Sequence, residues 1–237
     1  MIQQMRNPLM LALDVDTREE CSHFAKHLGN QVGAIKLGPR LLLKYGATLV
    51  QELSALAPIF VDCKFLDIPS TMDAAVRASF EAGASFATVH AWAGVDALKL
   101  LAQTEKELNE KRRFKILVVS ILTSFEQKSL PPPCDQFAIS DQVEKLVAMA
   151  SGVGHSSFVC SPHEVKSLRA GGADRFLVTP GVRMPGDDAG DQVRVMTPNQ
   201  ALNEGASALV VGRSLLKAKD PKAKLVEILE SINSREL

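Results

Sequence analysis

The chain has 237 residues, of which 46% are hydrophobic and 23% charged, a composition typical of a globular protein with a substantial core. Its 27 basic and 27 acidic residues give a formal net charge of zero, which argues against a nucleic-acid partner held by bulk charge. No apolar run is long enough to span a membrane, residues 1–7 lack the long apolar segment typical of a signal peptide, and no Cys or His spacing fits zinc. We therefore expect a cytoplasmic protein with reduced thiols.

The first half of the chain alternates apolar runs of strand length with helical patterns. Residues 9–15 form the first predicted strand. The helix of residues 17–28 that follows has Thr17 and Glu20 at capping-box spacing, and Gly29 closes it. The other strands predicted here are residues 32–37, 58–61 and 86–90, and the other helices are residues 40–56, 70–82 and 95–111.

The second half continues the same alternation. A proline-rich loop through residues 131–133 is too irregular for a helix or a strand. Thr197 and Pro198 mark the start of a short helix, and the polar segment 182–196 before them is a candidate active-site lid. The predicted strands are residues 114–122, 157–160, 175–178 and 206–211, and the helices are residues 140–151, 162–170 and a final one that ends near residue 232.

Strands that alternate with helices in a single pass predict parallel strands joined by right-handed crossovers. Eight such units in roughly 230 residues favour a (β/α)₈ barrel. We expect residues 1–237 to form one α/β domain, because no linker or change in composition divides the chain. A doubly wound open sheet is the alternative, although no GxGxxG motif follows the first strand.

The segment after the third predicted strand is unusually rich in charge. Asp62 and Lys64 are two residues apart, so both side chains leave the same face of an extended strand. Opposite charges on a buried strand are costly unless they pair. Asp67 and Pro69 follow, and Pro69 suits the first turn of a helix. The segment is either a structural ion pair at a strand end or the catalytic edge of an α/β enzyme.

In a barrel the carboxyl ends of all strands face one mouth, so polar residues at these ends should meet there. Taken singly, His90 fits a hydrogen-bonded structural histidine, and Asp14 fits a loop cap. Lys36, Asp62 and Lys64 lie on apolar strands, however, so the whole group indicates an active site. The candidates at these ends are Asp14, Lys36, Asp62, Lys64, Asp67, His90, Thr123, Gln192 and Arg213.

A phosphate site is predicted at the end of the last strand. Gly212 and Arg213 precede the final helix, where free N–H groups and the helix dipole favour an anion. Gly212 lets the backbone approach the anion, and Arg213 can hold two phosphate oxygens at once. Gly181 and Gln192 lie in the adjacent loop. The alternative is a helix start with a surface arginine.

Together these residues closely resemble the orotidine 5′-phosphate decarboxylase family in its bacterial single-domain form. The family signature Asp-x-Lys-x-x-Asp-Ile-Pro-x-Thr is matched by Asp62, Lys64, Asp67, Ile68, Pro69 and Thr71. Leu66 and Ser70 stand where many relatives have His and Asn. Further matches cover nearly the whole chain, at residues 13–14, 35–36, 122–124, 179–181, 190–192 and 211–213.

The resemblance implies that the protein decarboxylates orotidine 5′-phosphate to UMP, the last step of UMP synthesis in the pyrimidine pathway, without a cofactor or metal. It implies an alternating charged network of Lys36, Asp62, Lys64 and Asp67, in which Lys64 protonates the C6 carbanion. It also implies a homodimer, with Asp67 supplied by the neighbouring subunit. The substrate-binding residues that it implies are Asp14, Lys36, Ile68, Thr71, Thr123, Arg183, Gln192, Gly212 and Arg213.

Two other functions fit parts of the pattern. A decarboxylase of the 3-keto-gulonate 6-phosphate type has the same Asp-x-Lys-x-x-Asp strand but works through a metal-stabilised enediolate. Lys36 stands where that metal site would want an acid. A catalytically silent phosphate-binding barrel would be expected to have a broken charge network, whereas every member of the network is present here.

Overall fold

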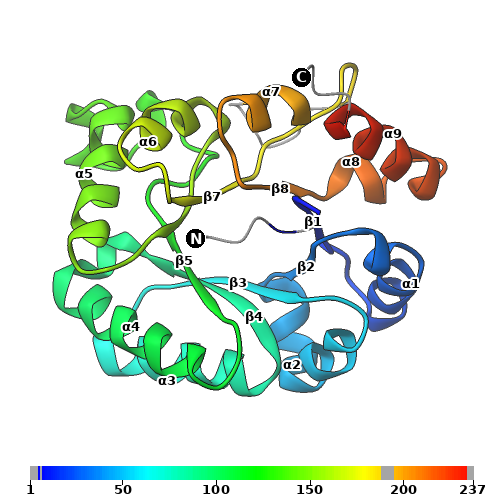
Figure 1. Ribbon diagram of the computed structural model, residues 1–237, viewed down its shortest axis with the longest axis horizontal. Helices are drawn as coiled ribbons and strands as arrows, with labels where there is room; N and C mark the ends of the chain where they lie inside the picture. The colour runs from blue at the N-terminus through cyan, green and yellow to red at the C-terminus, as the bar shows by residue number, and fades with distance from the viewer. Residues whose placement is uncertain (1–4, 6, 188–194, 234–237) are drawn as a thin grey trace.

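In the computed structural model, which describes residues 5, 7–187 and 195–233, eight parallel strands form a closed barrel (Figure 1). Each strand pairs with the next one along the chain. Pairing of Leu9 with Leu209 and of Leu11 with Val211 joins the first strand to the last, so the open-sheet alternative is wrong. The strands are β1 (Leu9–Ala12), β2 (Ala34–Leu37), β3 (Ile59–Phe65), β4 (Ala84–His90), β5 (Lys115–Val119), β6 (Ser157–Val159), β7 (Phe176–Thr179) and β8 (Ala208–Val211).

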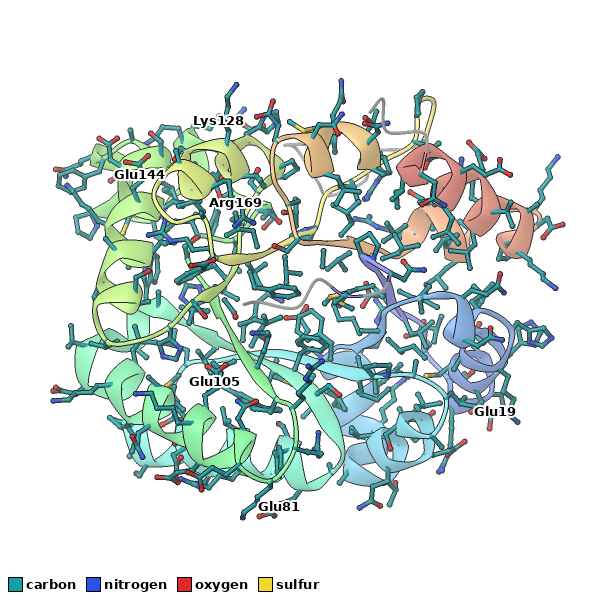
Figure 2. The ribbon with its side chains drawn as sticks, viewed as in Figure 1. Glu19, Glu81, Glu105, Lys128, Glu144 and Arg169 are labelled. Carbon is teal, nitrogen blue, oxygen red and sulfur yellow. The ribbon has the colours of Figure 1, made fainter. Side chains whose placement is uncertain are left out.

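Helices surround the barrel on the outside, as expected for right-handed crossovers between parallel strands (Figure 1). Figure 2 shows Glu19 and Glu81 at the outer edge of this ring, pointing away from the barrel. The helices are α1 (Arg18–Leu28), α2 (Pro39–Ser54), α3 (Pro69–Glu81), α4 (Gly94–Asn109), α5 (Ile139–Gly152), α6 (Val165–Ala170), α7 (Pro198–Asn203), α8 (Arg213–Leu216) and α9 (Pro221–Asn233).

The core has two layers, because successive residues of a strand face opposite sides of the sheet. Leu9 and Leu11 of β1 face the helices, whereas Met10 and Ala12 face the barrel interior. Aromatic rings fill that interior, and the rings of Phe86 and Phe176 stack with their centroids 6.3 Å apart. The barrel is therefore packed below the level at which its polar residues begin.

The alternation along β2 and β3 explains how charged side chains come to lie inside the barrel. Ala34 and Phe60 face the interior core. Lys36 and Asp62 are each two residues further along, so they face the same interior nearer to the carboxyl ends of their strands. The β2–β3 register pairs Lys36 with Phe60, so Asp62 is the next interior residue of β3 and lies diagonally across from Lys36.

Two helix starts predicted from the sequence are confirmed. The Thr17 side chain accepts a hydrogen bond from the Glu20 N–H, and the Glu20 carboxylate accepts one from the Thr17 N–H. Thr197 and Gln200 form the same reciprocal box before α7, with Pro198 at its first position. Such boxes satisfy backbone N–H groups that have no partner within the helix.

Another predicted boundary was wrong. The segment after β8 is not one helix but two, because the Asp220 carboxylate accepts hydrogen bonds from the N–H groups of Lys222 and Ala223 and starts α9 anew. The predicted end of α1 at Gly29 is confirmed, although Gly29 makes no left-handed turn there, since its φ is −59°. Its lack of a side chain serves packing instead, because a Cβ there would lie 3.1 Å from Ile35 Cδ1.

None of the helices in the described residues is both long enough and apolar enough to cross a lipid bilayer. The expected cytoplasmic location stays a prediction.

Candidate active site

A cavity of about 410 Å³ opens at the carboxyl ends of the strands. Its lining comes from β1–β3, β5, β6 and β8 and from loops that follow strands, including the loop after β7, so it lies at the mouth where barrel enzymes keep their active sites. Its size lies in the range of sites for small molecules. The lining residues are Ala12, Asp14, Lys36, Phe60, Asp62, Lys64, Val119, Ile121, Leu122, Thr123, Ser124, Val159, Pro180, Gly181, Arg183, Val210, Gly212 and Arg213.

Four charged side chains of alternating sign form a row on one wall of this cavity. Lys36 Nζ lies 3.4 Å from Asp14 Oδ1 and 3.3 Å from Asp62 Oδ2. Lys64 Nζ lies 2.9 Å from Asp62 Oδ1. The structure thus brings together Asp14, Lys36, Asp62 and Lys64, which come from three neighbouring strands or their ends.

The centre of the row is buried yet charged. Only 11% of the Lys36 side chain and 12% of the Asp62 side chain are exposed. Burial by itself would raise the pKa of the Asp62 carboxyl, but Lys36 and Lys64 outweigh it and hold that pKa below its ordinary value. Burial likewise opposes the charge of Lys36, and Asp62 and Asp14 outweigh it and raise the pKa of its ammonium. Both groups therefore stay ionised at neutral pH.

Replacing Asp62 with asparagine is expected to lower the free energy of unfolding at pH 7 by about 3–5 kcal/mol, because Lys36 keeps only the half-exposed Asp14 as a partner. A carboxyl with a lowered pKa stabilises the fold above the pKa of an unfolded aspartate, about 3.9, and this contribution is lost as the pH falls further. The difference between variant and parent should therefore narrow below about pH 4.

Urea unfolding of the parent and of Asp62→Asn, at neutral pH and at about pH 3.5, measures this effect. Asp174→Asn, which changes an exposed aspartate, serves as the control and should show no such narrowing. If the difference in unfolding free energy between the parent and Asp62→Asn does not change with pH, the ionised Asp62 carboxylate does not stabilise the fold.

Lys64 has an unusual backbone, which the sequence did not predict. Its φ is 48°, in the left-handed region that side-chain-bearing residues rarely adopt. The register of β3 against β4 shifts here, since Val61 pairs with Ala87 and Phe65 pairs with Val89. Three residues of β3 thus lie opposite a single residue of β4. Bulges and left-handed residues of this kind concentrate at functional sites, where they re-aim a side chain.

The residue opposite this bulge is Thr88, which was not among the sequence candidates. Its hydroxyl accepts a hydrogen bond from the Lys64 N–H at 2.8 Å and donates one to Asp62 Oδ1 at 3.0 Å. In the sequence it reads as an ordinary β-branched strand residue between Ala87 and Val89. Only its position across from the bulge distinguishes it.

Two further cations line the cavity besides the lysines of the row. Arg183 and Arg213 both line it, together with Gly181 and Gly212. Gly181 has a φ of 81°, which favours glycine. Gly212 is needed for space, because a Cβ there would lie 3.1 Å from Ala12 Cβ. The lining as a whole carries four cations, Lys36, Lys64, Arg183 and Arg213, against the carboxylates Asp14 and Asp62, a formal charge of +2.

The two ends of the candidate lid are joined at the cavity. Val182 pairs with Met196 in an isolated bridge, and the Arg183 N–H donates to the Met196 carbonyl at 3.0 Å. Further along, Asp187 Oδ1 lies 3.1 Å from Lys224 Nζ of α9. Residues 188–194 lie outside the described residues, and the predicted site residue Gln192 is one of them. The lid and the role of Gln192 stay predictions.

Three predicted site residues from the signature do not line this cavity. Asp67, Ile68 and Thr71 are exposed where β3 leads into α3. The Asp67 carboxylate accepts a hydrogen bond from the Ile68 N–H at 2.7 Å. Within the part of the chain that the structure describes, no ion pair involves Asp67. The structure therefore separates these three from Lys36, Asp62 and Lys64 within one chain.

His90 is buried at the end of β4 and does not line the cavity. Its Nδ1 accepts a hydrogen bond from the Trp92 N–H at 3.4 Å, at the start of a single 3₁₀ turn. Burial lowers the pKa of His90, and the positive charge of Lys64 adds to this effect. These contacts agree with a structural histidine.

The four cysteines are free thiols, and Cys21 and Cys160 are buried. Across the described ranges no group of three or more His, Cys, Asp or Glu side chains could hold a metal ion.

Comparison with known proteins places this geometry in context. A model of the family described as "Orotidine 5'-phosphate decarboxylase / HUMPS family" matches residues 7–228. A protein of that first name from Rhodopseudomonas palustris strain BisB5 is 38% identical over 229 residues, which cover 96% of this chain and 95% of the relative. One from Trichlorobacter lovleyi is 35% identical, with 92% of each chain covered.

A solved structure gives the same result. The crystal structure of orotidine 5′-phosphate decarboxylase from Lactobacillus acidophilus is similar with a TM-score of 0.83 and 32% sequence identity. The match covers 96% of this chain and all of that one. Likeness therefore extends over the whole barrel, including every strand that contributes to the cavity.

Proposed function

Because the chain belongs to the orotidine 5′-phosphate decarboxylase / HUMPS family, we propose that it removes CO₂ from orotidine 5′-phosphate to form UMP, the last step of UMP synthesis. The observation that carries this proposal is the unbroken row of Asp14, Lys36, Asp62 and Lys64 on one wall of the cavity. The two arginines that also line the cavity, Arg183 and Arg213, suit a phosphate monoester.

The chemistry explains why such a row is needed. Loss of CO₂ from C6 of the pyrimidine leaves a carbanion that no adjacent carbonyl delocalises. A reaction without a cofactor must then stabilise this charge with groups that are in place before it forms. The Lys64 ammonium supplies a positive charge beside C6 and a proton that can be transferred to it.

Asp62 keeps Lys64 in position, and Lys36 in turn holds Asp62. Asp62 accepts a hydrogen bond from Lys64 Nζ and faces Lys36 with its other oxygen, so it cannot turn away without breaking one pair. In the proposed complex Asp62 lies near the departing carboxylate, and Asp14 and Lys36 meet the ribose hydroxyls. Thr123, which lines the cavity, contacts the pyrimidine.

The phosphate is held at the other end of the cavity by Arg183, Gly212 and Arg213, with Gln192 completing the set by family resemblance. Energy gained from this remote contact can close the loop over the substrate and lower the barrier at C6. The helix after Gly212 is a single turn, so the arginine side chains are expected to contribute more than the helix dipole.

Replacing Arg213 with alanine is expected to weaken UMP binding by about 10–150-fold, because a hydrogen bond to a charged group contributes about 1.5–3 kcal/mol. Calorimetric titration with UMP measures the change. Lys217→Ala, which removes an exposed cation at the end of α8, should leave the Kd within about twofold of the parent value. An unchanged Kd for Arg213→Ala would remove Arg213 from the phosphate site.

The active unit in this proposal is a homodimer in which Asp67 reaches the cavity of the partner, with Thr71 close by. Support comes from the exposure of Asp67 in one chain and from the apolar side chains around it. The exposed residues Leu66 and Ile68 follow β3, and the Ile68 side chain is 63% exposed. Trp92 and Val95, which are also exposed, follow the neighbouring β4. Exposed apolar side chains grouped in this way indicate an interface.

A single assay tests the reaction. The ultraviolet band of orotidine 5′-phosphate should disappear on addition of the protein with a metal chelator present, and UMP should form. Decarboxylation of 3-keto-gulonate 6-phosphate that the chelator abolishes would instead favour the metal-dependent chemistry. Protein that binds UMP but leaves the band unchanged would be a silent phosphate-binding barrel, and the proposed reaction would be wrong.

A further inference from the structure

Thr88 occupies the only position of β4 that faces the bulge of β3, between the paired residues Ala87 and Val89. Its side chain is fully buried, with 0% exposed. One oxygen atom, Thr88 Oγ1, touches both charged members of the bulge: it accepts from the Lys64 N–H and donates to Asp62 Oδ1. A hydroxyl has one donor and two acceptor sites, so it can make both bonds at once.

We propose that Thr88 is a positioning residue for the decarboxylation, whose hydroxyl holds the Lys64 backbone and the Asp62 carboxylate in the arrangement that aims the Lys64 ammonium at C6. This inference rests on the proposed function. It assigns Thr88 no contact with the substrate, since Thr88 does not line the cavity.

The first reason is the backbone of Lys64. At a φ of 48° the residue is held in a conformation that needs support from its surroundings. The bulge interrupts the regular ladder, and the Lys64 N–H bonds to the Thr88 hydroxyl. Without this acceptor the segment is free to relax toward an ordinary extended strand, and the direction of the Lys64 side chain would change with it.

The second reason is the orientation of Asp62. Its Oδ1 receives hydrogen bonds from Thr88 Oγ1 and from Lys64 Nζ, which leaves Oδ2 for Lys36. The Thr88 side chain is branched at Cβ and has few accessible rotamers, so the position of its hydroxyl is well fixed. Thr88 therefore fixes the orientation of the Asp62 carboxylate, which pairs with both lysines.

The test compares Thr88→Val, which keeps the shape and removes the hydroxyl, with Thr88→Ser, which keeps the hydroxyl. Because misplacement of a catalytic group by about 1 Å can lower a rate about 100-fold, we expect kcat of Thr88→Val to fall by about 10–100-fold. The Kd for UMP should stay within about twofold, since the phosphate site is remote. Thr88→Ser should restore kcat to within about threefold of the parent.

A second readout does not need turnover. A UMP analogue with a negatively charged oxygen on C6 resembles the charge that develops there, so the parent should bind it far more tightly than UMP. Thr88→Val should lower this preference by about the same factor as kcat. If the parent binds the analogue more tightly than UMP but does not decarboxylate orotidine 5′-phosphate, the proposed function is wrong. The effect of Thr88→Val on analogue binding still tests the positioning role.

Thr104→Val is the matched control. Thr104 is also fully buried, and its hydroxyl donates to a carboxylate, that of Asp73, but between α3 and α4 and away from the cavity. The kcat of Thr104→Val and the preference of this variant for the analogue over UMP should stay within about twofold of the parent values. Circular dichroism verifies folding of each variant, and Thr88→Cys replaces Thr88→Val if the latter does not fold.

Two results would overturn the inference. One is a Thr88→Val variant with kcat and analogue preference within twofold of the parent. The other is loss of UMP binding in parallel with kcat, without recovery in Thr88→Ser, because a general packing defect rather than a lost hydroxyl would then explain the variant.

Discussion

Replacing Lys64 with alanine is expected to lower kcat by about 10⁴-fold or more and to leave the Kd for UMP within about threefold of the parent. The large effect on kcat arises because Lys64 provides both the positive charge beside C6 and the proton that is transferred to C6. The small effect on UMP arises because the product has no charge at C6, and its phosphate binds at the other end of the cavity. Single-turnover kinetics and calorimetry measure the two quantities.

Lys64→Arg separates the two roles of the lysine. A guanidinium keeps the positive charge but does not give up its proton near neutral pH, so we expect this variant to remain strongly impaired. Lys217→Ala, at an exposed lysine, is the control for loss of a cation and should retain full activity. Decarboxylation by Lys64→Ala at more than about one hundredth of the parent rate would exclude Lys64 as the proton donor.

Mixing two inactive variants is expected to restore activity if Asp67 acts across the dimer. The decarboxylation rate of Asp67→Ala alone, and of Lys64→Ala alone, should be lower than that of the parent by about 10²-fold or more. In a hybrid dimer the site that contains Lys64 receives an intact Asp67 from the partner, and the other site lacks both. Random exchange makes half of the dimers hybrid, so about one quarter of all sites should recover.

Native mass spectrometry measures how many hybrid dimers form, and recovered activity should be proportional to that fraction. A mixture of Lys64→Ala with Asp62→Asn is the negative control, because both changes affect the site of their own chain and no intact site can arise. Hybrid dimers without recovery in the Asp67 mixture would show that Asp67 acts within its own chain, or not at all.

Much of the fold could be read from local sequence patterns. Alternation of apolar runs with helical spacing, together with caps at Thr17 and Thr197, predicted the order of strands and helices and hence a closed parallel barrel. These signals are local, since a cap needs only residues three apart and a buried parallel strand needs only a continuous apolar run. The ends of elements depend on more than such patterns: the break before α9 depends on the Asp220 carboxylate, which caps a new helix.

The sequence by itself also determined which charges had to meet. Lys36, Asp62 and Lys64 interrupt apolar strands, and burial of unpaired charges is too costly to leave them apart. Only the tertiary structure decided how they meet. The left-handed backbone of Lys64, the bulge opposite Thr88 and the exposure of Asp67 in a single chain depend on the register of β3 against β4 and on packing between distant segments. Such features follow from long-range contacts, and the residue types along one strand do not encode them.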